Sequence, residues 1–321
     1  MKNTVRVAIH NDETEALLTR IKDTIPATEV LCCHSNQELE AAVSNFKPDV
    51  VFSVRFDSSP FPTEALLSED GPRWISVGGS GCDHLGKWDT SRVTVTNSAG
   101  VASAMMAEFV FGCALHFTLD VEGLQRDKKA HDWPIKMVKP LRDKTLLLVG
   151  LGETGKAVAA RAKAFGMHVI GTRARPQAVD NVDEVFAASD LPNLWTRADL
   201  ICICVPRLAS TLGLVDAAAF KAMKSSAILV DVSRGGVIVP SAAIEAMRKG
   251  EIAGAAFDVF ETEPLPEDSP YWDLPNTIIS PHASAVYEGW DLASFDMFLA
   301  NLKRWQARAT LQNVVDPTRG Y

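Results

Sequence analysis

Three polar residues in the second half of the chain, Arg234, Glu263 and His282, could together bind a small 2-keto acid and protonate its carbonyl oxygen. A guanidinium group presents a planar fork that binds a carboxylate and the adjacent carbonyl oxygen. A protonated imidazole can give a proton to that oxygen near neutral pH, and a neighbouring carboxylate stabilises the protonated ring. Taken alone, each residue is more often a solvated or structural group. Each of the three, however, follows a predicted strand, and all three strands come after a nucleotide-binding turn. This shared placement favours a catalytic role over a solvated or structural one.

That turn is the glycine-rich segment 150–155, GLGETG, which matches the G-x-G-x-x-G pattern of dinucleotide-binding sites. It follows the apolar run 146–149 and opens a predicted helix, which is the context that the pattern requires. Gly150 allows the tight turn, Gly152 lets the backbone approach a pyrophosphate, and Gly155 lets the helix pack closely on the strand. The helix N-terminus then faces the negative charge. The alternative is a glycine-rich turn that binds nothing.

The next predicted strand ends in the basic segment 171–175, GTRAR. An NAD-specific site usually has an acid about 20 residues after the glycines, where it binds the ribose 2′-hydroxyl. Thr172 occupies that position, and Arg173 and Arg175 follow it. Guanidinium groups bind phosphate, whereas a carboxylate would repel it. The sequence therefore predicts a preference for NADP(H), with NAD(H) as the alternative; two solvated loop arginines are the competing interpretation.

Two series of alternating strands and helices must position these residues, and they predict two parallel sheets covered on both faces. In the first series we expect strands at 4–10, 28–34, 49–54, 74–78 and 93–96, and helices at 12–25, 37–46 and 62–68. A long apolar helix at 102–117 follows. In the second series we expect strands at 145–149, 168–171, 200–205, 227–232, 253–258 and 277–280, and helices at 155–165, near 182–188, at 217–222, at 241–249 and finally at 286–307. The second series predicts a six-stranded doubly wound unit with the polar trio at the carboxyl ends of its strands, where ligands gather.

Composition narrows the class of protein. A chain of 321 residues with 47% hydrophobic and 22% charged residues is typical of two globular domains. A net charge of −8 without a long basic stripe argues against a nucleic-acid partner. No apolar run has the length of a membrane span, and the first residues lack a signal peptide. The six cysteines form no C-x-x-C pair and no metal-binding spacing occurs, so we expect reduced thiols, no metal and a cytoplasmic location.

At this point the sequence resembles the D-isomer-specific 2-hydroxyacid dehydrogenase family over nearly its whole length. The segments that carry the resemblance are 150–155, 223–236 (MKSSAILVDVSRGG), 254–264 (GAAFDVFETEP) and 280–282 (SPH). The resemblance implies that Arg234 binds the substrate, that His282 donates the proton and that Glu263 is its partner acid. It places Asp258 near the nicotinamide carboxamide.

The resemblance implies further contacts in the first part of the chain. Backbone amides of Ser80 and Gly81 would hold the substrate carboxylate, and Arg55 would add a cation.

The resemblance also implies cofactor contacts in the second part of the chain. The cofactor would touch residues that follow the strands of the second series, namely Leu151, Glu153, Thr154, Val205, Pro206, Val232, Ser233 and Ser284, besides Arg234 and His282 themselves. Two positions depart from the family's pattern: an acid is missing at 172–175, and Cys82 stands where a small aliphatic residue is common.

The fold implied is α/β, with a Rossmann cofactor domain inserted in a flavodoxin-like substrate domain. The substrate domain would comprise residues 1–100 and 286–321, and the NAD(P)-binding domain residues 101–285. We expect a homodimer that uses the long helix after residue 101. The predicted activity is NADP(H)-dependent reduction of a 2-keto acid to the D-2-hydroxy acid, with glyoxylate or hydroxypyruvate as candidate substrates. The alternative is a cofactor-sensing protein like the family's transcriptional corepressors.

Overall fold

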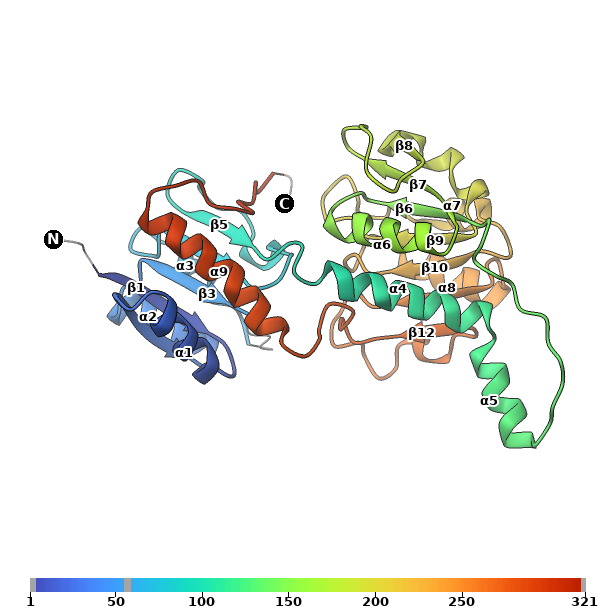
Figure 1. Ribbon diagram of the computed structural model, residues 1–321, viewed down its shortest axis with the longest axis horizontal. Coiled ribbons are helices and arrows are strands. Elements are labelled where there is room, and N and C mark those ends of the chain that lie inside the picture. The colour runs from blue at the N-terminus through green and yellow to red at the C-terminus, as the bar shows by residue number, and fades with distance from the viewer. Residues whose placement is uncertain (1–3, 55–58, 319–321) are drawn as a thin grey trace. The chain divides into compact units, whose positions relative to one another are not determined.

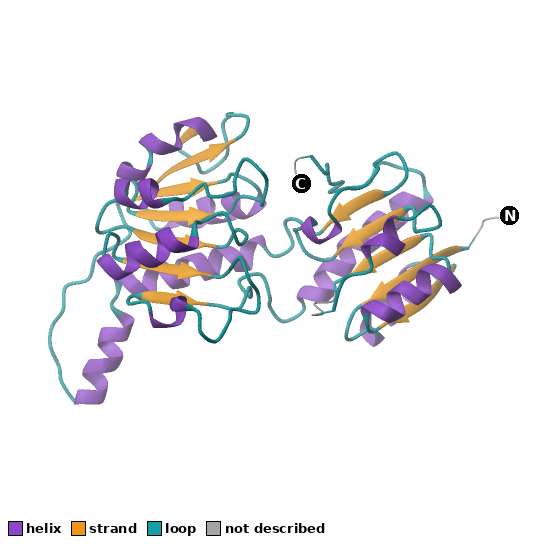
Figure 2. Cartoon of the chain, turned by 180° about the vertical axis from the view of Figure 1, so that it is seen from behind, coloured by secondary structure: helices purple, strands orange, loops and turns teal. Residues whose placement is uncertain are grey.

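A computed structural model of the chain describes residues 4–54 and 59–318. Contacts divide the chain into two compact units: a first unit of Met1–Val101 with Tyr287–Tyr321, and a second unit of Ala102–Val286 (Figure 1). Each unit has its own parallel sheet with helices on both faces (Figure 2). The α/β fold class predicted from the alternating pattern is therefore confirmed.

The first unit contains a five-stranded parallel sheet. Its elements are β1 (Val5–His10), α1 (Glu15–Thr24), β2 (Thr28–Cys33), α2 (Asn36–Asn45), β3 (Val50–Ser53), α3 (Thr63–Leu67), β4 (Trp74–Val77), η1 (Asp83–Leu85), β5 (Thr94–Asn97) and α9 (Trp290–Gln306). The strand order is β2-β1-β3-β4-β5. Side chains of a strand alternate between its faces, so Val7 and Ile9 of β1 pack against α1 and α9, whereas Ala8 packs against α2 and α3. The Ser35 side chain caps α2 by accepting a hydrogen bond from the N–H of Glu38.

The second unit contains a seven-stranded parallel sheet. Its elements are α4 (Ser103–Thr118), α5 (Val121–Ala130), β6 (Thr145–Val149), α6 (Glu153–Ala164), β7 (His168–Arg173), β8 (Glu184–Ala187), η2 (Ala188–Asn193), η3 (Trp195–Arg197), β9 (Leu200–Ile203), α7 (Ala217–Ala222), β10 (Ile228–Asp231), α8 (Pro240–Lys249), β11 (Gly254–Phe257), η4 (Pro270–Asp273) and β12 (Thr277–Ile279). The strand order, β12-β11-β10-β9-β6-β7-β8, reverses at β6. In such sheets ligands bind at the carboxyl ends of the strands beside the reversal. Helices α4 and α6 cover one face, while α7 and α8 cover the other.

One prediction for the second unit was wrong: the segment near 182–188 contains the strand β8 instead of a helix. Glu184–Ala187 pairs in parallel with β7, so the sheet has seven strands and not six. The four side chains of β8 are all half-buried, as expected of an edge strand. A short apolar run does not distinguish a strand from a helix by its local pattern, and pairing with β7 decided the outcome.

Two other elements differ from the expectation. The last helix begins at Trp290, later than the expected residue 286, because Gly289 takes a φ of 82° immediately before it. Helix α5 was not expected; the side chain of Asp120 caps it by accepting from the N–H of Gly123 at 3.0 Å. Helix ends depend on such local contacts more than on hydrophobic period.

Three further features of the described residues concern membrane-spanning helices, metal-binding clusters and the state of the cysteines. Across 4–54 and 59–318, a lone helix with the length and apolar character of a bilayer span is not found; α4 and α5 meet that test only as a pair bent by 52°. Within the same residues, no three His, Cys, Asp or Glu side chains gather as a metal site would require. All six cysteines are free thiols.

Candidate active site

The glycine-rich turn connects β6 to α6 at the carboxyl end of the strand where the order reverses. Gly150 has a φ of 110°, which residues with a Cβ rarely adopt. A Cβ on Gly155 would lie 2.2 Å from the carbonyl oxygen of Gly150, so glycine is needed there for α6 to approach the turn. A Cβ on Gly152, in contrast, would meet no atom of residues 4–54 and 59–318 within 4 Å. Open space at a helix N-terminus, next to free N–H groups, fits the pyrophosphate of a dinucleotide.

The open space at Gly152 gives a prediction that separates cofactor binding from folding. We expect Gly152→Ala to change the melting temperature little, because its φ of −79° suits alanine and the added methyl meets no atom of the described residues. The methyl would occupy the approach of the pyrophosphate, so the affinity for NADPH should fall about tenfold or more. Gly112→Ala in α4, where space is also open, is the matched control. Unchanged NADPH affinity in the Gly152 variant would contradict the assignment of this turn.

Other residues assigned to the cofactor lie in the same turn. Leu151 is buried, with 4% of its surface exposed, so its side chain belongs to the core. Glu153 is exposed and forms an ion pair with Lys156, with Nζ 2.8 Å from Oε1. The hydroxyl of Thr154 donates to the sulfur of Met106 at 3.5 Å. These side chains have partners within the protein, so we expect the backbone of this segment to face a ligand.

Val205 and Pro206 follow β9 and border the turn. Cγ1 of Val205 lies 3.1 Å from the position that a Cβ on Gly150 would take. Both residues are half-buried. Their position beside the reversal in strand order is the one predicted for residues that line a cofactor.

The end of β7 carries the residues on which the NADP(H) prediction depends. Thr172 is buried, whereas Arg173 is half-buried and Arg175 is exposed. In the described part of the chain, neither arginine side chain has an ion-pair or hydrogen-bond partner. Two guanidinium groups at this strand end are therefore available to an anion.

Glu263 and His282 form the central contact of the site. Nδ1 of His282 lies 2.8 Å from Oε2 of Glu263, and the other carboxylate oxygen accepts from the N–H of Phe260 at 2.9 Å. Because an ionised carboxylate only accepts, Nδ1 carries the hydrogen in this contact and Nε2 is left for another partner. The His282 and Glu263 side chains are 37% and 36% exposed, so the pair is accessible to a ligand.

The surroundings keep Glu263 ionised. Burial by itself raises the pKa of the Glu263 carboxyl, but the hydrogen bonds from His282 and Phe260 and the charges of His282 and Arg234 outweigh it, so the pKa lies below its usual range. A carboxyl with a lowered pKa loses its favourable contacts only as the pH falls through that pKa. Around neutral pH the carboxylate is therefore present to stabilise a protonated imidazole.

Asp258 holds the loop that carries His282. Its carboxylate is 1% exposed and accepts hydrogen bonds from the hydroxyl of Ser280 at 2.6 Å, the N–H of Ala283 at 2.8 Å and the N–H of Ser284 at 3.1 Å. Its carbonyl oxygen accepts from the N–H of His282 at 2.8 Å. His282 has a φ of 52°, an uncommon conformation for a residue with a Cβ, and these bonds fix it. Asp258 therefore positions His282; its predicted contact with the nicotinamide stays a prediction, as does that of Ser284.

Arg234 lies in the turn after β10, between Ser233, which is buried, and Gly235, which is half-buried. Its Nη1 donates to the carbonyl oxygen of Ser233 at 2.7 Å, and its charge acts on Glu263. Val232 and Ser233 are 3% and 2% exposed. Arg234, Glu263 and His282 thus follow three neighbouring strands, β10, β11 and β12, as the sequence predicted.

Sequence reasoning missed one residue of this turn, Asp231. It is 2% exposed and accepts hydrogen bonds from Ser233 through its Oδ1. A signal was present in the sequence, since a carboxyl at the end of the apolar run 228–232 needs a partner or a proton when it is buried.

The predicted substrate contacts of the first unit follow β4. Ser80 is exposed and Gly81 is half-buried. The carbonyl oxygen of Ser80 accepts from the side chain of Asn97 at 2.7 Å, and neither N–H of the Ser80–Gly81 pair bonds to a described residue. These two N–H groups fit the predicted carboxylate contact. Arg55 lies outside the described residues, and the departure at Cys82 proves to be a buried thiol.

Comparison with known proteins assigns the chain to a family. The profile of the NAD binding domain of D-isomer specific 2-hydroxyacid dehydrogenases matches residues 111–284, more than half of the chain. The glyoxylate/hydroxypyruvate reductase B of Escherichia fergusonii is 34% identical over 293 residues, 88% of this chain and 89% of the relative. The chain belongs to the D-isomer specific 2-hydroxyacid dehydrogenase family, and the resemblance inferred from its motifs is confirmed. The second unit is the domain that binds the nicotinamide dinucleotide.

Other relatives match over different shares of their length. The D-3-phosphoglycerate dehydrogenase of Methanocaldococcus jannaschii is 34% identical over 227 residues, 70% of this chain but 43% of that relative. A D-isomer specific 2-hydroxyacid dehydrogenase family structure from Aeromonas salmonicida superposes with a TM-score of 0.86 at 27% identity, covering 98% of this chain and all of that one. An NADPH-dependent glyoxylate/hydroxypyruvate reductase from Sinorhizobium meliloti has the same fold, with a TM-score of 0.84 at 24% identity over 99% of this chain and all of that one.

Proposed function

We propose that this protein is an NADP(H)-dependent reductase that converts a small 2-keto acid to the D-2-hydroxy acid. The observation that carries the proposal is the 2.8 Å contact between His282 and Glu263, beside Arg234, at the carboxyl ends of the strands of a nicotinamide-binding sheet. Glyoxylate and hydroxypyruvate are the substrates to test first. The relative from Escherichia fergusonii, which matches over most of both chains, is named for that activity.

Each residue of the site has its own role in the proposed reduction. When bound, the reduced nicotinamide supplies the hydride that enters the carbonyl carbon. Arg234 binds the substrate carboxylate and the carbonyl oxygen through its fork, which orients the substrate and offsets the charge developing on that oxygen. His282 gives the proton on Nε2 to the oxygen, while Glu263 holds Nδ1–H and stabilises the protonated ring. The carbonyl double bond thus becomes one C–H and one O–H bond.

NADP(H) is preferred in this proposal because Arg173 and Arg175 follow Thr172 at the end of β7. The 2′-phosphate of NADP carries a negative charge that these two guanidinium groups, which have no partner among the described residues, can bind. NAD(H), which has a 2′-hydroxyl there, would leave them without that contact.

We also propose that the protein acts as a homodimer in the cytoplasm. After α4, the helix that we expected at the dimer contact, α5 and the loop that follows project from the second unit (Figure 1). The large apolar side chains of this arm are strongly exposed, namely Leu124 (53%), Trp133 (94%), Ile135 (97%), Met137 (99%) and Val138 (48%). Such a patch supports a protein partner, and a symmetric second copy is the commonest one. Light scattering that gives the monomer mass would contradict the dimer.

The experiment that tests the function is a turnover assay with the purified protein. NADPH oxidation would be followed with glyoxylate, hydroxypyruvate, pyruvate and 2-ketoglutarate, and the configuration of the product determined. We expect turnover of at least one short 2-keto acid and a D product. NADPH binding without any turnover would favour the cofactor-sensing alternative.

Replacing Glu263 should move the pH profiles of both directions of the reaction to lower pH. Reduction needs protonated His282, and oxidation needs the neutral ring. Glu263→Gln keeps the shape of the side chain but removes the charge that stabilises the protonated ring. We therefore expect the reductive kcat/KM to decline at lower pH than in the native protein, and the oxidative activity to persist to lower pH.

The measurement is a pair of pH–rate profiles between about pH 5 and pH 9, one in each direction, since these limits bracket the usual titration range of an imidazole. Glu261→Gln, which changes a neighbouring exposed carboxylate, is the matched control. A reductive profile that does not move in the Glu263→Gln variant would show that Glu263 does not tune His282.

A further inference from the structure

Asp231 is a buried carboxyl at the centre of the second sheet. It ends β10, where it pairs in register with Ile203 of β9 and Phe257 of β11, and it is 2% exposed. The other residues of β10 are apolar. A carboxyl in such a place costs free energy unless it has partners or a proton.

The contacts of Asp231 connect two parts of the candidate site. Its Oδ1 accepts from the N–H of Ser233 at 3.0 Å and from the Ser233 hydroxyl, and this fixes the turn that carries Arg234. Its carbonyl oxygen accepts from the N–H of Asp258 at 3.0 Å. Both the arginine turn and the carboxylate that holds the His282 loop are therefore tied to this one residue.

Two charged groups act on Asp231: the carboxyl of Asp258, which follows β11, and the guanidinium group of Arg234. Cys202 of β9 and Tyr271 of η4 also interact with it, and both stay protonated near neutral pH because their pKa values are raised. Burial, more than any other cause, raises the pKa of Asp231 to about 7; Asp258 adds to this rise, and Ser233 and Arg234 oppose it. The carboxyl therefore changes its charge within the physiological range.

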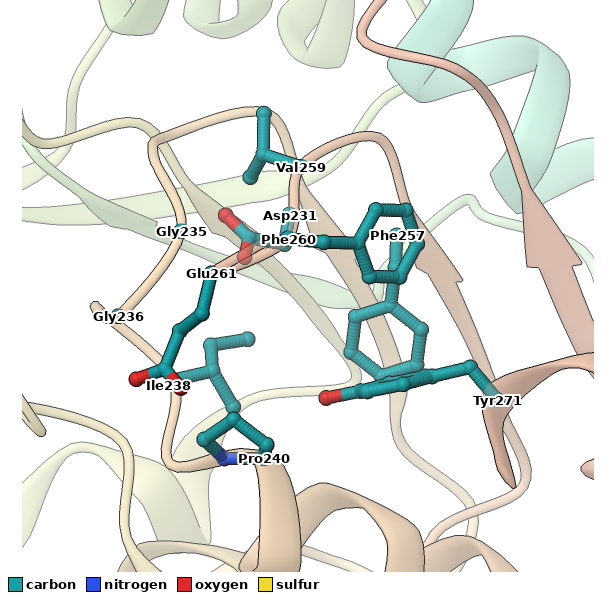
Figure 3. A pocket seen from close by; sticks show the side chains of 10 residues that line it. All are labelled: Asp231, Gly235, Gly236, Ile238, Pro240, Phe257, Val259, Phe260, Glu261 and Tyr271. Atoms are coloured by element: carbon teal, nitrogen blue, oxygen red, sulfur yellow. The ribbon is translucent and has the colours of Figure 1, made fainter. Parts of the chain in front are cut away.

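A small cavity of about 20 Å³ lies against Asp231 and contains no compensating cation among its lining residues, all of which the structure describes. Gly235, Glu261 and Tyr271 are among those residues, and Figure 3 shows the Tyr271 hydroxyl pointing toward Ile238 and Pro240. A Cβ on Gly235 would lie 1.9 Å from the carbonyl oxygen of Phe260, so the turn that carries Arg234 packs closely against Phe260 and only glycine fits at this position. Besides the two hydrogen bonds from Ser233, Arg234 is the cation that favours an ionised Asp231.

We propose that Asp231 is a positioning residue whose charge determines how much of the positive charge of Arg234 is available to an anionic substrate. The neutral carboxyl holds the turn through its Ser233 hydrogen bonds and leaves the guanidinium group to the substrate. The ionised carboxyl attracts that group and competes with the substrate carboxylate. This inference rests on the proposed function of Arg234.

Asp231→Asn provides the test, because the amide oxygen can still accept from Ser233 but the side chain cannot ionise. The KM and kcat for glyoxylate or hydroxypyruvate would be measured with saturating NADPH from pH 6 to pH 8. We expect the ratio of native to variant KM to rise several-fold over this range, while the ratio of kcat values changes little. Effects of His282 protonation are common to both proteins and cancel in the ratio. Asp231→Leu, which removes the acceptor, should raise KM at every pH, and Asn should rescue it.

A second measurement does not depend on activity. Because ionisation of a buried carboxyl with a raised pKa destabilises the folded state, the native protein should lose stability relative to the Asn variant as the pH rises. The melting temperature of the variant minus that of the native protein should therefore increase from pH 5 to pH 8. A constant difference, or a flat KM ratio in an active enzyme, would overturn the role of Asp231 alone. The lack of any turnover would overturn the proposed function and this inference together.

Discussion

The protein with His282→Ala should bind NADPH nearly as well as the native protein but reduce its keto acid on the order of 10²–10⁴ times more slowly, the usual contribution of a general acid. The reason lies in the geometry: Nδ1 of His282 is held by Glu263 at 2.8 Å, which leaves Nε2 free of that contact and able to act as the proposed proton donor. The loop should survive the change, because Asp258 holds it through Ser280, Ala283 and Ser284. Steady-state kinetics and NADPH fluorescence titration measure the two quantities.

His34→Ala is the matched control, since His34 is an exposed imidazole of the first unit. It should leave the reduction rate unchanged. If the His282→Ala variant retained near-native turnover, His282 would not be the proton donor. A parallel loss of NADPH affinity would indicate instead that the imidazole mainly supports the cofactor.

The double variant Arg173→Ala/Arg175→Ala should lose NADPH affinity by on the order of 10²–10⁴, since each charge-assisted hydrogen bond contributes roughly 1.5–3 kcal/mol. NADH has no 2′-phosphate, so its affinity should change little. The physical basis is the availability of both guanidinium groups at the end of β7, next to a buried Thr172 that offers no negative charge.

Dissociation constants for both cofactors, measured for the native and the double variant, test this prediction. Arg248→Ala, which removes an exposed arginine from α8, controls for the change in overall charge. Equal use of NADH and NADPH by the native protein would contradict the assignment of these arginines to the phosphate.

The sequence by itself determined the family, the two parallel sheets and the residues of the candidate site. The reason is that these features depend on local chemistry. The spacing of the glycines at 150, 152 and 155 follows from backbone geometry, and hydrophobic alternation of strand and helix predicts the sheets. Arg234, Glu263 and His282 could be grouped because each follows a strand of one parallel sheet, and the carboxyl ends of such strands share an edge.

The tertiary structure decided what local pattern does not encode. Pairing with β7 made Glu184–Ala187 a strand, although its sequence suits a helix equally well. The 2.8 Å contact between His282 and Glu263 depends on a loop whose shape Asp258 sets by hydrogen bonds across 22 to 26 residues. The burial of Asp231, and with it the rise in its pKa, results from strands on both sides of β10. Exclusion of water and contacts between distant segments create these properties, and both arise only when the chain has folded.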